Sequence, residues 1–234
     1  MNEQMPIRDN PFYGAYDRKG QGVRLKAKHI RQFNRDFVAA GSFVPTMSVL
    51  ELGCGNGLFL HFLHHLGTHR FVGVDGDPRV LKELPPNLTD KVTIADFSDF
   101  FVEARQERFD RVVLFDVLEH FSAEDGTELL RKVATLLSPG GRIIVRTPNM
   151  GSPFALGVQY NDVTHLTCYT PGSLSQVARV AGLRLISSHP QAYASAWREV
   201  REKVLTSILS WFLAAPPTIW SPNFIGVLEP AESP

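Results

Sequence analysis

The sequence predicts a doubly wound α/β fold in a single domain. From residue 48 onward, short apolar runs alternate with stretches in which apolar residues recur at helical spacing. Strands and helices that alternate in this way form a mostly parallel sheet with helices on both faces, because the crossover connections are right-handed. At 234 residues the chain is long enough to bury one large core.

The first half of the chain contains four predicted strands and two predicted helices. The strands are short, apolar and mostly rich in branched residues, and they cover 48–52, 70–75, 91–97 and 111–117. The helices cover 57–67, which ends at Gly67, and 78–84. The strand at 111–117 is apolar almost throughout, which is typical of a strand that is buried on both faces.

The second half continues the pattern with three more strands. A helix that carries Leu129, Leu130, Val133 and Leu136 ends at the turn sequence SPGG, residues 138–141. Strands are expected at 141–148, 183–188 and 224–230, and helices at 173–182 and about 194–213. We expect an N-terminal helical arm over 1–45 and one domain over 46–234, with insertions that cover the acceptor at about 149–170 and 191–217.

Composition limits the classes of function. The chain has 24 basic and 24 acidic residues, which disfavours a protein that grips nucleic acid through its phosphates. Cys54 and Cys168 lie far apart, so a disulfide framework or a zinc site has little support and a reducing cytoplasm fits best. The first residues lack the apolar core of a signal peptide, and the apolar stretch 204–215 is shorter than the roughly 20 residues that span a bilayer. We therefore expect a cytoplasmic protein that does not cross a membrane.

A glycine-rich turn, ELGCGNG (51–57), follows the first predicted strand. Its glycines, Gly53, Gly55 and Gly57, lie at the carboxyl edge of the sheet, where doubly wound proteins bind ligands. The spacing differs from the dinucleotide fingerprint, whose third glycine would fall at Leu58, and no P-loop lysine follows. The ligand is therefore not expected to be anchored by phosphate at this turn.

Acidic residues follow the next two predicted strands. Asp75 comes 18 residues after Gly57, close to the spacing at which an acid accepts hydrogen bonds from ribose hydroxyls. Asp96 with Phe97 offers an acceptor and an aromatic plane, which suit the amine and the face of adenine. Each acid alone also fits a helix cap or a turn, but their order on successive strand ends favours a ligand that contains ribose and adenine.

These motifs resemble those of class I S-adenosylmethionine-dependent methyltransferases, and the resemblance runs from about Val49 onward. Matching segments are ELGCGNG, GVDGD (73–77), ADF (95–97), FDVLEHF (115–121), LSPGGRIIVRTPN (137–149) and HLTCYTPGSLSQVARVAGL (165–183). The resemblance implies a Rossmann-like sheet of seven mostly parallel strands whose last strand is antiparallel, and S-adenosylmethionine as cofactor. It implies a cofactor site formed by Glu51, Gly53, Gly55, Gly57, Asp75, Gly76, Asp96, Phe97 and Phe115.

The segment FDVLEHF supplies the candidate catalytic groups. Asp116, Glu119 and His120 stand at i, i+3 and i+4, so they are expected on one helical face, and His165 falls in the region that covers them. A hydroxyl that attacks the methyl group must lose a proton, to a base or with the help of a metal. Glu-His here is similar to a metal-binding feature of ubiquinone-type O-methyltransferases and of a terminal-ribose RNA methyltransferase family, although Asp116 is shorter than their usual Glu. We favour His120 and His165 as metal-free catalytic residues and leave a divalent ion open.

The methyl acceptor is less readable than the cofactor. Asn149, Tyr160 and Asn161 suit a hydroxylated molecule, so we expect O-methylation of a small acceptor such as a sugar or a secondary metabolite. Alternatives are a quinone-type phenol, N- or C-methylation, and a cofactor-binding scaffold without turnover. Tyr13 and Tyr16 of the arm could form part of a lid, and the helix at about 194–213 is either core or the face of a homodimer.

Overall fold

The structure is a computed structural model that describes residue 12 and residues 24–193 and 195–231. Tyr13 and Tyr16, the aromatic residues of the predicted lid, lie outside the described residues. Within the described part, the arm contributes helix α2 (Ala27–Phe33) and a π-helical turn, Asn34–Ala39, which continues directly from it.

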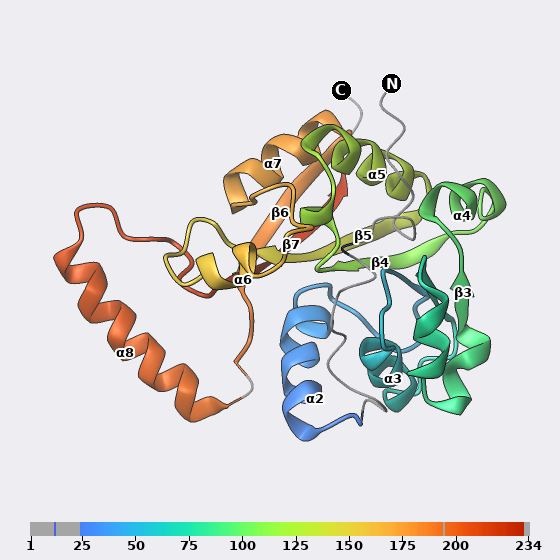
Figure 1. Ribbon diagram of the computed structural model, residues 1–234, viewed down its shortest axis with the longest axis horizontal. Coiled ribbons are helices and arrows are strands. Elements are labelled where there is room, and N and C mark those ends of the chain that lie inside the picture. The colour runs from blue at the N-terminus through green and yellow to red at the C-terminus, as the bar shows by residue number, and fades with distance from the viewer. Residues whose placement is uncertain (1–11, 13–23, 194, 232–234) are drawn as a thin grey trace.

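Within the described residues, seven strands form one sheet in the order β3-β2-β1-β4-β5-β7-β6 (Figure 1). The strands are β1 (Val49–Leu52), β2 (Phe71–Asp75), β3 (Val92–Ile94), β4 (Phe109–Phe115), β5 (Leu137–Pro148), β6 (Leu183–Pro190) and β7 (Asn223–Pro230). Strands β1 to β5 pair in parallel, whereas β7 lies antiparallel between β5 and β6. The predicted fold class is confirmed, including the antiparallel last strand.

Helices cover both faces of the sheet, and each face has its own apolar core. On one face, α2, the π-helical turn and α3 (Leu58–His65) pack on alternate residues of the strands, including Val49, Val113 and Ile144. On the other face, α4 (Phe97–Glu103), α5 (Ala123–Thr135) and α7 (Pro171–Val180) pack on the residues between them. This alternation follows from the period of two along a strand and explains why these strands are apolar almost throughout.

Two strand boundaries differ from the sequence prediction by three residues or more, and the helix predicted at 78–84 is a 3-10 helix, Pro78–Lys82. Strand β3 ends at Ile94, so Asp96 does not end a strand; it is the N-cap residue of α4, a helix that the sequence pattern did not predict. Strand β5 begins at Leu137, so the SPGG sequence lies inside it, where the pairing with β4 shifts register. A register shift accommodates turn residues within a strand. The SPGG sequence therefore does not mark the start of β5, although its residues are typical of a turn.

Helix α8 (Ala196–Phe212) stands away from the rest of the molecule, between β6 and β7 in the chain (Figure 1). A short helix α6 (Leu156–Tyr160) lies in the connection that follows β5. Among the described helices, none is both long enough and apolar enough to cross a membrane.

Candidate functional site

The glycine turn after β1 has left-handed backbone at all three glycines, with φ of 73° at Gly53, 51° at Gly55 and 71° at Gly57. A Cβ on Gly53 would lie 2.7 Å from Val117, and one on Gly57 would overlap Leu84, so these two glycines are required by packing within the protein. A Cβ on Gly55 would meet no described atom within 4 Å. Of the three, Gly55 therefore borders open space that a ligand could occupy.

Asp75, at the end of β2, holds this turn in place. Its Oδ2 accepts a hydrogen bond from the Gly55 backbone at 2.8 Å, and its Oδ1 accepts one from Asp77 N at 2.9 Å. A Cβ on Gly76 would lie 3.4 Å from Asp96 Oδ1, so Asp96, at the start of α4, lies beside the end of β2 that carries Asp75. Phe97, the first residue of α4, stacks on Phe121 with ring centroids 6.3 Å apart. The structure thus brings together the residues predicted for the ribose and the adenine.

Glu51 and Phe115 lie deeper than the turn. Glu51 on β1 is buried, its Oε2 has no hydrogen-bond partner among the described residues, and burial raises the pKa of its carboxyl well above 4.5. A buried carboxyl with an unsatisfied oxygen is a strong candidate for an ammonium or sulfonium ligand. The Phe115 ring stacks on Phe33 at 6.1 Å and meets Phe59 edge to face, so it has a packing role that its position at a strand end did not reveal. Its contact with a cofactor stays a prediction.

The spacing predicts that Asp116, Glu119 and His120 share one helical face, but in the structure Asp116 does not. It adopts a left-handed backbone with φ of 58°, and only Leu118–His120 form a short 3-10 turn. The Asp116 carboxylate instead receives two hydrogen bonds from Arg146 on β5, from Nε at 2.9 Å and from Nη2 at 2.5 Å. The Arg146 guanidinium also lies over the Phe115 ring, 4.6 Å from its centroid. The prediction was wrong because the partner of Asp116 comes from another strand.

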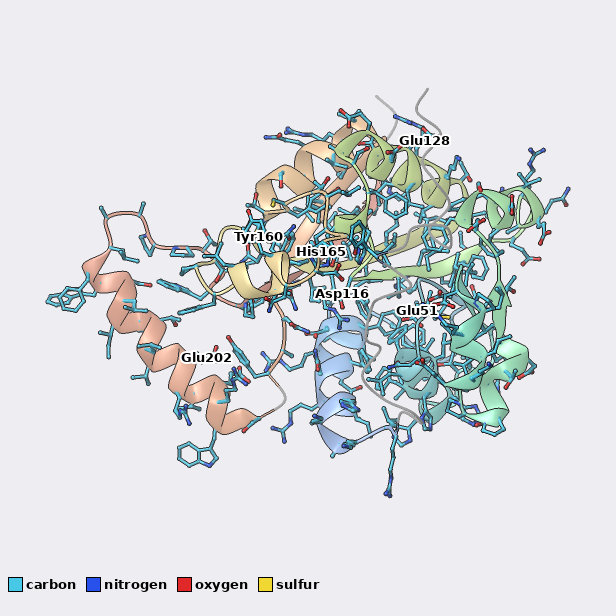
Figure 2. All side chains as sticks on the ribbon, viewed as in Figure 1. Glu51, Asp116, Glu128, Tyr160, His165 and Glu202 are labelled. Carbon is cyan, nitrogen blue, oxygen red and sulfur yellow. The ribbon has the colours of Figure 1, made fainter. Side chains whose placement is uncertain are left out.

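His120 and His165 lie together, with ring centroids 4.8 Å apart. They meet because the loop that carries His165 is bonded to the turn that carries His120: Glu119 O accepts hydrogen bonds from Leu166 N at 2.7 Å and Thr167 N at 3.1 Å. In Figure 2, His165, Asp116 and Glu51 follow one another across the middle of the molecule, and the exposed Tyr160 lies beyond His165. The predicted pairing of the two histidines is therefore seen in the structure.

Hydrogen bonds fix the ring nitrogens of both histidines. Thr164 Oγ1 donates its single hydrogen to Asp162 Oδ1 at 2.6 Å, so it must accept from His120 Nδ1 at 2.9 Å. His165 Nδ1 lies 2.9 Å from the carbonyl oxygen of Gln159, which only accepts. Each histidine thus carries a hydrogen on Nδ1, and in the neutral ring Nε2 keeps its lone pair.

Electrostatics favour the neutral form of His120. Burial, and then the neighbouring His165, lower the pKa of His120 below 6.5, against the opposing effect of Asp162. Burial also acts on Asp162, but hydrogen bonds from Thr164 outweigh it and hold the pKa of that carboxyl below 3.8. Asp162 therefore stays ionised, and the Asp162–Thr164 pair orients His120 through Nδ1, which puts the lone pair of the neutral ring on Nε2.

Glu119 is a buried acid beside the two histidines. Burial, and then the charge of Asp116, raise the pKa of Glu119 well above 4.5, and neither of its carboxylate oxygens has a hydrogen-bond partner among the described residues. One ligand atom from each of Glu119, His120 and His165 lies within 4.8 Å of the others. One oxygen and two imidazole nitrogens, each ring held through its other nitrogen, fit a divalent transition metal. Asp116 is not part of this group, because Arg146 holds it.

Sequence reasoning missed three polar residues and misassigned a fourth. Arg146 lies inside the matched segment 137–149, which assigned it no role, Thr164 lies just before another matched segment, and Asp162 is a common loop residue, so only the fold reveals their partners. Asn149, predicted to meet the acceptor, is buried, and its side-chain amide donates to the carbonyl oxygens of Ile219 at 2.8 Å and Ser221 at 3.2 Å. It therefore secures the connection to β7 and does not face an acceptor.

Comparison with known sequences places this geometry in context. The family model described as "Methyltransferase domain" matches residues 26–188. A ubiquinone biosynthesis O-methyltransferase from Xanthomonas campestris pv. campestris is 33% identical over 128 residues, which cover 53% of this chain and 52% of that protein. One with the same description from Aeromonas salmonicida is 25% identical over 150 residues, 58% of this chain and 62% of that protein. The matches thus span about half the length of these curated relatives.

Solved structures share the fold at low sequence identity. An S-adenosylmethionine-dependent methyltransferase from Archaeoglobus fulgidus superposes with a TM-score of 0.66 at 18% identity, covering 88% of this chain and 95% of that one. The CcbJ methyltransferase from Streptomyces caelestis gives a TM-score of 0.61 at 19% identity, covering 93% of this chain and 95% of that one. At these identities the likeness supports the architecture alone.

Proposed function

Because this chain belongs to the class I S-adenosylmethionine-dependent methyltransferases, we propose that it transfers a methyl group to a hydroxyl of a small molecule, with His120 as the base. The observation that carries the chemistry is the partly buried histidine pair, in which both Nδ1 atoms donate to acceptors, so that the lone pair of each neutral ring lies on Nε2. The match to ubiquinone biosynthesis O-methyltransferases supports oxygen as the methylated atom.

The described residues fit S-adenosylmethionine, which supplies an electrophilic methyl group on a sulfonium when bound. In this proposal Gly55 borders the methionyl part, where the described residues leave open space, and Glu51 faces its positive charge with a carboxyl oxygen that has no hydrogen-bond partner among those residues. Asp75 and Asp96 accept from the ribose and the adenine at the shared strand edge, next to Phe97. Burial alone favours the protonated form of Glu51, and the positive charge of the cofactor would favour the ionised form, so Glu51 would lose its proton as the cofactor binds.

His120 would remove the acceptor proton. The ionised Asp162 orients Thr164, which accepts from His120 Nδ1, so Nε2 is the nitrogen that receives the hydroxyl proton. His165 packs against the imidazole edge and excludes water from one side of it. The chain thus positions a neutral base next to the cofactor edge, and positioning supplies much of the rate of a displacement reaction.

The alternative chemistry is a divalent ion held by Glu119, His120 and His165. In the metal-free mechanism, a chelator leaves the rate unchanged, and Glu119→Gln retains activity because the carboxyl then only packs. Assays of methyl transfer with and without EDTA, followed by Mn²⁺ or Zn²⁺, distinguish the two. Loss of activity with EDTA and its return with the ion would replace the base by a metal centre.

Two glycines of the turn separate ligand binding from stability. Gly55→Val is expected to abolish S-adenosylmethionine binding, measured by calorimetry, because its side chain enters the open space beside the turn. Gly55→Val should lower the free energy of unfolding by only about 1–2 kcal/mol, the cost of a left-handed backbone at a residue with a side chain. Gly57→Val is the matched control: its side chain overlaps Leu84, so it should lower the free energy of unfolding well beyond that backbone cost. Cofactor binding that survives in a folded Gly55→Val protein would remove this turn from the proposed site.

The acceptor is proposed to be a small hydroxylated molecule, with sugars and secondary metabolites first and quinone-type phenols next. A screen of purified protein with radiolabelled S-adenosylmethionine against sugars, nucleotide sugars, catechols and amines tests this. Transfer of label to amines alone would assign N-methylation. Binding of cofactor with no transfer to any class would support a scaffold without turnover.

A further inference from the structure

Helix α8 presents its apolar side away from the protein. Five of its exposed apolar residues recur every three or four positions and form one stripe: Trp197, Val200, Val204, Ile208 and Trp211, which are 79%, 52%, 56%, 52% and 80% exposed. Leu205 and Phe212 are also exposed and lie beside the stripe. With a rise of 1.5 Å per residue, this stripe is about 21 Å long. A helix of this kind normally turns its apolar stripe toward a core.

Among the described side chains of α8, the partly buried side is mostly polar, with Leu209 as its one apolar member. Glu199 accepts from Arg35 at 2.6 Å, near the end of α2, and from Lys203 at 3.0 Å, while Glu202 pairs with Arg198 at 3.0 Å. Thr206 lies on the same side and is partly buried. The helix is thus attached to the body through its charged side, which leaves the apolar stripe without cover from any described residue.

The stripe is self-complementary about Val204. Trp197 and Trp211 lie seven residues to either side of it, and Val200 and Ile208 lie four residues to either side. If a second copy packs antiparallel with a two-fold axis at Val204, each Trp197 faces the partner's Trp211 and each Val200 faces the partner's Ile208. A two-fold dimer requires this kind of self-matching patch.

Charge and area agree with this arrangement. In the antiparallel register, Arg201 faces the partner's Ser207 and Arg198 faces the partner's Ser210, so no like charges oppose each other across the pair. Each aromatic side chain contributes about 150–250 Å² of contact area. Two tryptophans, the exposed Phe212 and the aliphatic residues together approach the roughly 800 Å² per partner of a standard interface. We propose that α8 is the dimerisation helix of this protein and pairs antiparallel with α8 of a second copy.

The test is the mass of the full chain in solution, measured by sedimentation from micromolar concentrations upward. We expect a dimer for the natural sequence and a mass half as large for Val204→Glu, which sets two carboxylates against each other on the axis. Val102→Glu is the matched control, because Val102 on α4 is 59% exposed and Val204 is 56% exposed. The control should remain a dimer, and circular dichroism should show the same helix content in all three proteins, so that loss of the dimer is not loss of the fold.

Cross-linking tests the register. In a Cys168→Ser background, which removes the exposed native thiol, Val204→Cys should form an intermolecular disulfide with itself upon oxidation. Val200→Cys should cross-link only when mixed with Ile208→Cys. A monomer at every concentration, or a dimer that Val204→Glu leaves intact, would overturn the proposal. Cosedimentation of a monomeric chain with phosphatidylcholine–phosphatidylglycerol vesicles would also overturn it and assign the stripe to a lipid surface.

Discussion

Replacing His120 by alanine is expected to lower the rate of methyl transfer by about 10²- to 10⁴-fold, the usual contribution of a positioned general base. Affinity for S-adenosylmethionine should remain, because the residues proposed to hold the cofactor lie on β1, β2 and the start of α4. Calorimetry measures the affinity and a single-turnover assay measures the rate. Equal rates for the natural protein and a His120→Ala, His165→Ala double variant would contradict both the base and the metal mechanism.

The pH dependence of the rate tests the same assignment. The neutral imidazole is the active form, so the rate rises with pH until His120 has lost its proton. Because burial and His165 lower the pKa of His120, the midpoint should lie below 6.5, and the rate should be level above it. Thr164→Val removes the acceptor that holds Nδ1 and should depress the plateau, whereas cofactor affinity should not change. A midpoint above 6.5 would show that another group titrates.

Replacing Arg146 by methionine is expected to lower the free energy of unfolding by about 3 kcal/mol, because it removes the positive charge that compensates several nearby carboxylates. Asp116 loses both hydrogen bonds, and the nearby carboxyls of Asp36, Glu51 and Glu119 lose their compensating charge. Urea unfolding followed by circular dichroism measures the change. The pair with Asp116 contributes little to this figure, because the Asp116 side chain is 46% exposed and solvent screens it. The larger part comes from the buried carboxyls of Asp36, Glu51 and Glu119.

The sign of its pH dependence distinguishes a charge effect from lost packing. Burial already raises the pKa of Asp36, Glu51 and Glu119 above the unfolded values, and loss of the opposing charge of Arg146 raises it further. Such groups destabilise the protein when the pH is above the unfolded pKa, and the penalty disappears as the pH falls and they take up protons. The deficit of Arg146→Met should therefore shrink in acid. A deficit that is the same at pH 7 and pH 5 would indicate packing alone.

The sequence predicts the parts of the site that depend on local pattern. The glycine turn, Asp75 and the strand ends follow from strand–turn–helix order, and all of them meet at one sheet edge in the structure. Asp116 shows the limit of this reasoning, because spacing assumes a helix, whereas a positive φ and the distant Arg146 set its direction. The sequence does not predict the hydrogen bond between Thr164 and His120 for a similar reason, because it forms only when the loop packs back onto Glu119.

The place of β7 in the sheet also determines the order in which the chain can be assembled as it leaves the ribosome. Strands β1 to β5 lie next to one another and form the parallel part of the sheet, so they can associate while the rest of the chain is still being synthesised. Strand β6 cannot add to this sheet at that stage, because among the described strands it pairs with β7 alone, and β7 is synthesised after it. Until β7 emerges, β5 and β6 each present an unpaired strand edge. Such edges bind chaperones or pair with other chains and aggregate. Substitutions that weaken β7 should therefore reduce the yield of folded protein during synthesis more than they weaken the finished sheet.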